Sequence, residues 1–273
     1  MNILIVDGND KNSSNQYEKL GMNTQFEEYK NILLKISSFK LNIQIIHPTW
    51  DDNFLKGNIN LDDFNGIVWT GSVLNIYNSQ PEITRQIELA KTLLEKKNKI
   101  FGSCWGLQVL ITAAGGLIRK NPNGLEAIVS KNILLNDQGI NHKMYIDKPL
   151  QFDSFCWHYD EVETIPNETV VLASNNYSDV QALTFTKGQS EVWAVQYHPE
   201  FSPNWVSGLM FMRKKILLEN RIYNNEKDFE NMYKYLFNFK ENKKLEKDLN
   251  LSNSLIDNTV RYIELHNWLN NLN

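Results

Sequence analysis

Short runs of hydrophobic residues alternate with amphipathic segments along the first half of this chain. Buried strands are predicted where apolar residues stand together, and helices where apolar residues recur at spacings of three and four. This alternation of strands and helices predicts an α/β fold, a mainly parallel sheet with helices on both faces. The strands expected are 2–6, 43–46, 66–70 and 99–101, and the helices expected are 26–36, 83–94 and 107–114.

Two connections are predicted from local sequence. Residues 8–23 are polar and rich in Asn and Ser, which favours a long loop. Ser79 stands three residues before Glu82, the spacing of a capping box, and Pro81 suits the first turn of a helix. We therefore expect Ser79 to cap the helix that follows.

The second half changes character, with short strands followed by a helical tail. The strands predict an antiparallel extension of the sheet and then a return to it. We expect one domain over residues 1–204 and a helical C-terminal extension, 205–273, packed on it. The Lys-rich run 240–247 alternates with Glu and Asp, as a solvated helix face does. The strands expected are 126–135, 144–146, 170–173, 182–185 and 191–196.

Aromatic residues of the extension have two open uses. We favour packing in the core, and a homodimer interface is the alternative. The residues concerned are Trp205, Phe211, Tyr233, Phe237 and Trp268.

Composition narrows the function classes. With 273 residues, 42% hydrophobic and 22% charged, the chain can bury a sizeable core. A net charge of −4 provides no basic field for nucleic acid or anionic lipid. No apolar run reaches the roughly 20 residues that span a bilayer. The N-terminus lacks a basic segment and is expected to form the first strand, not a signal peptide. We therefore expect a cytoplasmic protein whose two cysteines form no disulfide.

The segment from Ile100 to Gln108 carries the first candidate chemistry. A strand is expected to turn directly into a helix at Cys104, so the helix N-terminus favours a thiolate there. Gly102 and Gly106 permit a strained turn of the nucleophile-elbow type. The alternative is a buried structural cysteine, but the Gly-x-Cys-x-Gly setting after a strand favours a nucleophile.

A second segment, Gln196 to Glu200, supplies the partners that a thiol nucleophile needs. His198 is expected at the end of a strand, where it would act as general base and then as acid. Glu200 would hold the imidazole in the correct tautomer. A histidine at a strand end can also be purely structural; the carboxylate two residues away favours catalysis.

These two segments resemble the signatures of class I glutamine amidotransferase domains. The resemblance is carried by Gly102-Ser103-Cys104-Trp105-Gly106-Leu107-Gln108 and Tyr197-His198-Pro199-Glu200, and it covers roughly residues 1–205. It implies a flavodoxin-like α/β fold and the triad Cys104, His198 and Glu200. It also implies hydrolysis of the glutamine amide through a γ-glutamyl thioester, without a metal or an organic cofactor.

Further site residues follow from the same resemblance. Trp69-Thr70-Gly71-Ser72 stands in the place of the family's oxyanion loop, so the amides of Gly71 and Ser72 are expected to bind the oxyanion together with that of Trp105. Gln108 is expected to contact the amino-acid end of the substrate. Residues 157–162 resemble a Ser-His-x-Asp-x-Val segment, which assigns substrate contacts to His158, Tyr159 and Asp160. For His158 a packing role is an equal alternative.

The tail, 257–269, is similar to the C-terminal end of stand-alone GMP-synthase-like amidotransferases. No phosphate-binding glycine loop is present in the sequence, so we find no ATP-dependent half. One hypothesis is therefore an amidotransferase that passes ammonia to a separate synthase.

Two other functions stay open. The chain could be a γ-glutamyl-amine or γ-glutamyl-peptide hydrolase that needs no partner, or a catalytically inactive binding module, which an intact triad disfavours. The long segment 8–26 favours the hydrolase, because Asp7, Asn9, Tyr17 and Trp50 could surround a group on the γ-nitrogen.

Overall fold

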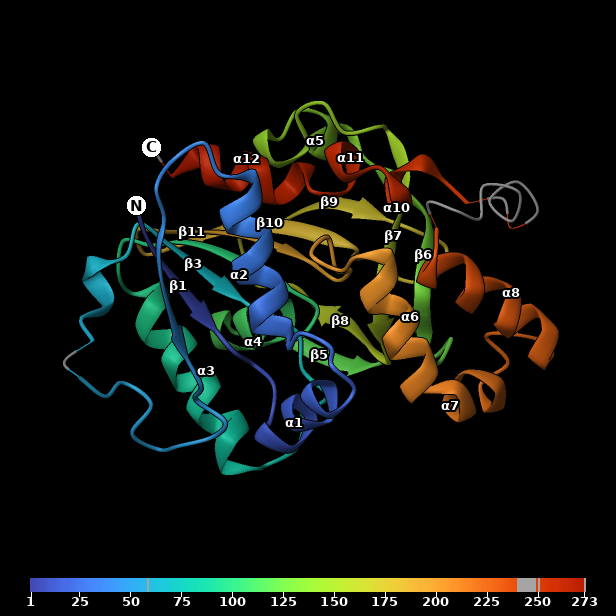
Figure 1. Ribbon diagram of the computed structural model, residues 1–273. Helices are drawn as coiled ribbons and strands as arrows, with labels where there is room; N and C mark the ends of the chain where they lie inside the picture. The colour runs from blue at the N-terminus through green and yellow to red at the C-terminus, as the bar shows by residue number, and fades with distance from the viewer. Residues whose placement is uncertain (58, 240–248, 250, 273) are drawn as a thin grey trace.

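The computed structural model describes residues 1–57, 59–239, 249 and 251–272 (Figure 1). The Lys-rich run 240–247, expected as a solvated helix face, lies outside these residues. In the ranges described, no helix is both long and apolar enough to cross a membrane.

A twisted sheet forms the centre of the molecule, and its nine strands in the described ranges run in the order β2-β1-β3-β4-β11-β10-β9-β6-β7 (Figure 1). The first five are parallel and the rest antiparallel, which confirms the predicted parallel sheet, its antiparallel extension and the return. A separate antiparallel pair joins β5 (Leu117–Lys120) and β8 (Asp160–Thr164). The parallel strands are β1 (Asn2–Val6), β2 (Asn42–Ile46), β3 (Gly66–Trp69), β4 (Lys99–Ser103) and β11 (Ser190–Val195); the others are β10 (Ala182–Lys187), β9 (Val170–Ser174), β6 (Glu126–Leu135) and β7 (Gln151–His158).

Helices cover both faces of the parallel strands, which is why the inner strands β1, β3 and β4 are buried along nearly their whole length. On one face, α3 (Pro81–Leu94) and α4 (Trp105–Ala114) share a core with Ile67 and Ile100. On the other, α2 (Gln25–Ile36) and α12 (Ile263–Asn271) share a core with Ile3 and Phe101. Figure 1 shows α2 and α12 on the opposite side of the sheet from α3 and α4.

The tail reaches the sheet at two places. Near the antiparallel strands, α6 (Pro203–Met212), α7 (Lys214–Glu219) and α8 (Glu226–Phe237) pack on residues of β6 and β7. Then α10 (Asn253–Ile256) and α11 (Asn258–Arg261) lead to α12. Trp268 of α12 lies so close to the start of β3 that a Cβ on Gly66 would be 2.8 Å from its ring.

The aromatic residues of the tail divide between core and surface. Trp205 and Trp268 are buried, which confirms the favoured core packing for these two. Tyr233 is half-buried, whereas Phe211 and Phe237 are exposed.

Residues 8–23 are not a long loop, so that prediction is wrong. Helix α1 (Lys11–Lys19) occupies most of the segment and is capped by Asp10, whose side chain accepts from the Ser13 amide. This helix carries one large hydrophobic residue, Tyr17, and therefore has no apolar stripe to reveal it. Tyr17 packs against Trp205 with ring centroids 5.3 Å apart, so α1 is held by the tail.

Three other local predictions need correction. Residues 144–146 form no strand, because 3-10 helix η2 (Lys143–Tyr145) lies there. Ser79 does not cap α3; the cap position belongs to Gln80, whose side chain makes no capping bond, and Pro81 begins the helix. Strands β5, β7 and β8 were not predicted, since polar residues such as Ser154 and His158 occupy buried positions in β7. Short elements complete the fold: η1 (Leu61–Asp63) and α5 (Asp137–Ile140).

Candidate active site

Cys104 occupies the sharp turn between β4 and α4. Its backbone has φ 51° and ψ −102°, a conformation that is strained for a residue with a side chain. The Cys104 amide donates to the Val195 carbonyl at 2.8 Å, which ties the turn to the neighbouring strand β11. A Cβ on Gly106 would lie 2.6 Å from the Trp69 carbonyl oxygen, so the helix can start this close to β3 only with glycine there. The turn thus has the form of a nucleophile elbow.

The Cys104 thiol lies in a cavity of about 210 Å³ at the carboxyl end of the parallel strands. Its Sγ is 3.5 Å from the Trp157 carbonyl oxygen, and the residue is 4% exposed. Cys156, the other cysteine, is buried and lines none of this cavity. Both thiols are free.

His198 and Glu200 stand beside the thiol. His198 Nδ1 is 2.6 Å from Glu200 Oε1, and the imidazole stacks on Phe201 with centroids 3.9 Å apart. Burial by itself would lower the pKa of His198, but the Glu200 carboxylate and Cys104 outweigh it and raise that pKa to about 10. The structure therefore brings together the three side chains of the expected triad and favours a charged imidazole between them.

Glu200 is held from a second direction. Ser103 donates a hydrogen bond to Glu200 Oε1 over 3.3 Å, and the Tyr29 hydroxyl donates to Ser103 Oγ at 2.6 Å. Burial raises the pKa of Tyr29 well above its usual range, so the phenol remains a donor. These two residues were not identified from the sequence. Ser103 precedes Cys104 in the strand, and Tyr29 lies on the inner face of α2.

The loop after β3 lies against the imidazole. A Cβ on Gly71 would be 2.6 Å from His198 Cε1, so glycine is needed for this approach. Among the described residues we find no acceptor for the amides of Gly71 and Ser72, and the Trp105 amide belongs to the first residue of α4. The three amides expected to bind an oxyanion are thus unoccupied by the described chain.

The predicted substrate residues line the same cavity, and one of them, His158, has hydrogen-bond partners at both ring nitrogens. Gln108, His158, Tyr159 and Asp160 all contribute to its wall. His158 Nε2 lies 2.7 Å from Glu126 Oε2, and its Nδ1 lies 3.0 Å from the Asp160 carbonyl oxygen. Since both ring nitrogens have partners, the geometry favours a packing role for His158, the alternative left open by the sequence.

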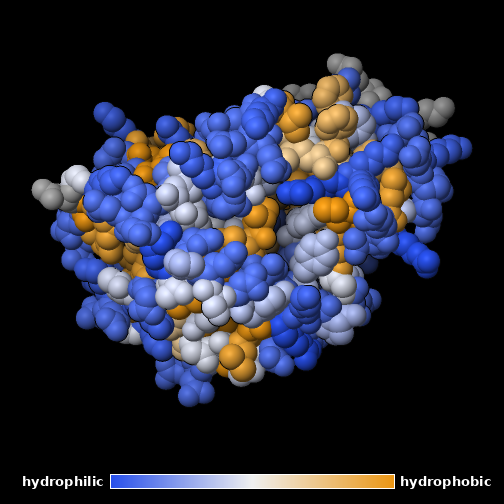
Figure 2. Space-filling model, turned by 90° about the horizontal axis from the view of Figure 1, so that it is seen from below, coloured by the Kyte–Doolittle hydropathy of each residue, from blue (hydrophilic) through white to orange (hydrophobic). Residues whose placement is uncertain are grey.

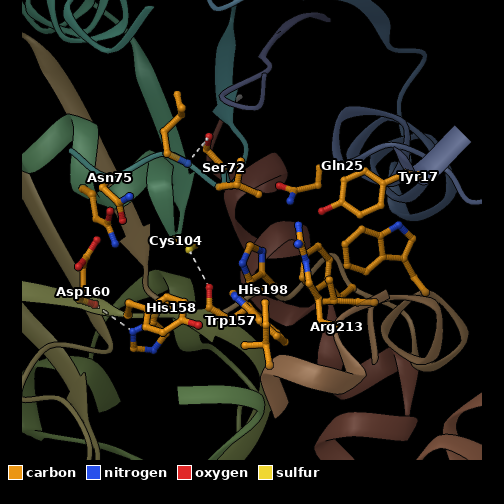
Figure 3. A pocket seen from close by; sticks show the side chains of 18 residues that line it. Tyr17, Gln25, Ser72, Asn75, Cys104, Trp157, His158, Asp160, His198 and Arg213 are labelled. Carbon is orange, nitrogen blue, oxygen red and sulfur yellow. Dashed lines mark hydrogen bonds between the residues drawn. The ribbon is translucent and has the colours of Figure 1, made fainter. Parts of the chain in front are cut away.

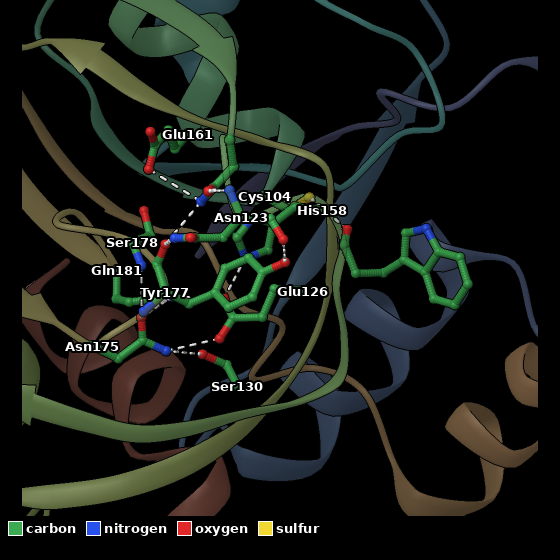
Figure 4. A network of polar contacts seen from close by, with 12 residues as sticks. Cys104, Asn123, Glu126, Ser130, His158, Glu161, Asn175, Tyr177, Ser178 and Gln181 are labelled. Carbon is green, nitrogen blue, oxygen red and sulfur yellow. Dashed lines mark hydrogen bonds and ion pairs between the residues drawn. The ribbon is translucent and has the colours of Figure 1, made fainter. Parts of the chain in front are cut away.

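Glu126 belongs to a polar network behind the cavity (Figure 4). Its carboxylate accepts hydrogen bonds from Asn175 at 2.7 Å and from Gln181 at 2.8 Å. Burial alone would raise the pKa of Glu126, but His158, Ser130 and Asn175 lower it. The network joins β6, β7 and the segment before β10, so it fixes the wall on which Tyr159 and Asp160 stand.

The expected pocket for a γ-nitrogen substituent is only partly formed by the residues proposed for it. Tyr17 lines the Cys104 cavity, but Asp7, Asn9 and Trp50 do not. Asp7 is buried with its Oδ2 2.9 Å from His47 Nδ1, and Trp50 stacks on His47 at 3.9 Å. These residues stabilise the loop after β2 instead.

Several lining residues were not predicted from the sequence. They come from α2, α6 and α7 and the turn between the last two. Trp205, Leu209 and Arg213 stand four residues apart, a spacing that would have placed them on one helix face. The lining residues of this kind are Gln25, Trp205, Leu209, Arg213 and Ile216.

No candidate metal site lies in the described ranges, because no three His, Cys, Asp or Glu side chains gather there in a way that could hold a metal ion.

Seen from below, the face that carries α1 and α7 is hollowed near its centre, and hydrophobic side chains lie there between hydrophilic ones (Figure 2).

Comparisons with known proteins identify related sequences. Residues 23–216 match the family model described as glutamine amidotransferase class-I. The whole chain is 30% identical over 281 residues to 93% of a γ-glutamyl-L-1-hydroxyisopropylamide hydrolase from Pseudomonas sp. A 127-residue stretch, 46% of the chain, is 28% identical to 64% of a glutamine-hydrolysing GMP synthase subunit from Methanococcus vannielii.

A solved structure is similar along nearly its whole length. It is a glutamine amidotransferase from Thermotoga maritima, with a TM-score of 0.65, 14% identity, and coverage of 99% of this chain and 97% of that one. At this identity the similarity concerns the fold, and it agrees with the predicted class I amidotransferase fold.

Proposed function

This chain belongs to the class I glutamine amidotransferase family, and we propose that it hydrolyses a γ-glutamyl amide to glutamate and ammonia or an amine. The observation that carries the proposal is the position of His198, which interacts with Cys104 on one side and Glu200 on the other. A thiol nucleophile needs this arrangement of base and orienting carboxylate.

In the first half of the reaction, Cys104 Sγ attacks the γ-carbonyl carbon of the substrate. The carbonyl oxygen becomes an oxyanion, for which the amides of Gly71, Ser72 and Trp105 are donors. When the tetrahedral intermediate collapses, the C–N bond breaks and His198 gives its proton to the leaving nitrogen. The raised pKa of His198 supports this role, because the imidazolium is available at neutral pH.

In the second half, water attacks the γ-glutamyl thioester. His198, now neutral, takes a proton from the water as the new C–O bond forms. The C–S bond then breaks, glutamate leaves, and the thiolate and imidazolium are restored. Glu200 holds the imidazole throughout and stabilises its positive charge.

We place the glutamyl part of the substrate against Gln108, Tyr159 and Asp160. Burial raises the pKa of Asp160, opposed chiefly by the hydrogen bond from Tyr77. A substrate ammonium beside this buried carboxylate would favour its charged form.

Of the two enzymatic hypotheses, a hydrolase that acts without a partner has more support. The similarity to the hydroxyisopropylamide hydrolase spans the full chain, whereas that to the GMP synthase protein of Methanococcus vannielii spans 46% of it. The cavity also extends beyond Cys104 and His198 to Trp205 and Arg213, farther than an ammonia leaving group requires. Supply of ammonia to a separate synthase is the second candidate.

The test is a screen of the purified protein alone against glutamine, γ-glutamyl amines and γ-glutamyl peptides. Fast hydrolysis of a substituted amide supports the hydrolase, and slow glutaminase activity that rises with an added synthase supports the amidotransferase. Cys104→Ala should lower kcat by several orders of magnitude with every substrate. Turnover that survives this change, or no turnover by the wild type, contradicts the proposed function.

A further inference from the structure

The cavity extends from Cys104 in two directions (Figure 3). Asn75, His158 and Asp160 lie on one side of the thiol, and Tyr17, Gln25 and Arg213 lie on the other. The first side carries a carboxylate and the second a guanidinium, so the two ends of a bound molecule meet opposite charges. We call the second side the amine subsite; its lining residues are Tyr17, Gln25, Trp205, Leu209, Arg213 and Ile216.

His198 indicates which side receives the leaving amine. In the proposed reaction this imidazole protonates the leaving nitrogen, which must therefore lie at its reactive edge. The imidazole stacks on Phe201, and Phe201 stacks on Trp205 with centroids 3.9 Å apart, so the stack leads from His198 to the amine subsite. Figure 3 shows His198 on the same side of Cys104 as Gln25 and Arg213, so a substituent on the leaving nitrogen extends to that side, away from Asp160.

Gln25 provides an acceptor at the entrance to the amine subsite. An ideal Cβ on Gly71 would lie 2.6 Å from His198 Cε1 and 2.7 Å from Gln25 Oε1, so both groups border the same piece of backbone. Gln25 is 6% exposed, and its Oε1 accepts no hydrogen bond from the described residues. A buried acceptor without a donor is costly, and the N–H of a substituted amide would satisfy it.

Arg213 provides a cation at the far end. Arg85 and Arg119 form salt bridges with carboxylates, whereas within the described ranges Arg213 forms none. It is half-buried. Burial raises the pKa of Tyr17 and of Tyr159, and the positive charge of Arg213 opposes both shifts, which places the guanidinium near the two phenols. A half-buried guanidinium without a counter-ion favours an anion, above all a planar carboxylate.

The wall between these polar groups is apolar. Trp205 and Leu209 are buried residues of α6, and Ile216 of α7 is half-buried. An aliphatic or aromatic side chain on the leaving amine would cover these surfaces and remove apolar area from water.

We propose that the amine subsite binds a leaving amine that is itself an amino acid, so that the substrates are γ-glutamyl-amino acids with an apolar second residue. Arg213 pairs with the carboxylate of that residue, and Gln25 accepts from the scissile amide N–H. This inference rests on the proposed function, and the reaction is unchanged: the C–N bond breaks, His198 protonates the nitrogen, and a free amino acid leaves.

The test compares two substrates that differ only in the carboxylate, γ-glutamyl-leucine and γ-glutamyl-3-methylbutylamide. Wild-type kcat/KM should be at least roughly tenfold higher for the dipeptide, the scale expected of one charge-assisted bidentate contact. Arg213→Gln should abolish this preference, and Arg213→Lys should retain part of it, because the charge remains while the planar fork is lost. Lys215→Gln, which removes an exposed cation of α7 paired with Glu219, is the matched control and should leave the preference intact.

The contrary outcomes are distinct. Equal kcat/KM for the two substrates in the wild type overturns the inference and leaves the proposed function standing. An Arg213→Gln variant that loses the same factor with both substrates also overturns it, because Arg213 would then contact the shared glutamyl part. Absence of hydrolysis of either compound and of glutamine contradicts the proposed function itself.

Discussion

The hydroxyl group of Ser103 lies 3.3 Å from Oε1 of Glu200, so the residue before the candidate nucleophile contacts the carboxylate that holds His198. Tyr29 donates to the same hydroxyl at 2.6 Å. Strand β4 and the segment after β11 are therefore linked by buried hydrogen bonds, in addition to the triad. These hydrogen bonds position Glu200. The other oxygen of its carboxylate, Oε2, has no hydrogen-bond partner among the described residues.

Ser103→Ala should disturb this positioning. Because the buried Tyr29 hydroxyl loses its acceptor, we expect a stability loss of about 1–3 kcal/mol. A less constrained carboxylate should also shift the pH profile of kcat/KM, which a purely structural serine would not do. Ser207→Ala is the control: it removes a 2.6 Å bond between a buried serine and the Asn204 carbonyl of its own helix. A pH profile that is identical in Ser103→Ala and wild type would contradict the positioning role.

The two cysteines should react at very different rates. Cys104 lines the cavity at the N-terminus of α4 and beside His198, so a small reagent that enters the cavity reaches its Sγ. Burial, together with the negative charge of Glu126, raises the pKa of Cys156 well above its usual range. Brief treatment with iodoacetamide, followed by peptide mass spectrometry, should label Cys104 first by roughly two orders of magnitude. Equal labelling rates would refute the proposed environment of Cys104.

The free energy of unfolding should fall as pH rises above neutrality, because of the interaction between His198 and Glu200. In the folded protein the His198 pKa is raised from 6.5 to about 10, so the folded state binds the proton more tightly than the unfolded state does. The stabilisation is complete below about pH 6.5 and is lost as pH rises through about 10. Urea unfolding from pH 6 to 10 should therefore show a decline that is smaller in Glu200→Gln, which lacks the carboxylate charge. The same slope in both proteins would exclude this pair as its cause.

Gly71→Ala should remove activity without unfolding the protein. The added Cβ would lie 2.6 Å from a His198 ring that is held by Phe201 and Glu200 and cannot easily move. We expect kcat to fall by roughly a hundredfold, the scale of a misplaced catalytic group. Gly208→Ala is a suitable control, because the atoms nearest to its Cβ belong to the flexible side chain of Met22. Full activity in Gly71→Ala would mean that the loop after β3 does not set the position of the imidazole.

Gln108→Leu should act on binding of the glutamyl part. Gln108 lines the cavity from α4, and we place the non-reacting end of the substrate there. Because such a contact contributes equally to ground state and transition state, KM should rise roughly tenfold while kcat changes little. Steady-state kinetics with the preferred amide measure both. An unchanged KM would refute the contact.

The sequence reveals those parts of the fold and site that depend on neighbouring residues. The predicted bounds of strand β6, 126–135, agree with the structure. Cys104 and His198 each stand in a short motif after a strand. Because β4 and β11 are adjacent and parallel, with Ser103 opposite Val195, the two motifs meet at one edge of the sheet.

Features that depend on contacts between residues far apart in the sequence could not be predicted in this way. Helix α1 is polar nearly throughout. It is held by the contact between Tyr17 and Trp205, a residue far along the chain. The amine subsite combines α1, α2, α6, α7 and the residue between the last two, so no single segment carries its pattern. His158 was ambiguous for the same reason, since its partner Glu126 is 32 residues away.

The contact between Trp268 and the start of β3 has a consequence for synthesis of the chain. The face of the sheet formed by Ile3 and Phe101 is covered in part by α12, which is translated more than a hundred and fifty residues after them. Until α12 has left the ribosome, Trp268 cannot cover this apolar surface. Complete burial of this face, which α2 covers earlier in part, therefore follows the emergence of α12.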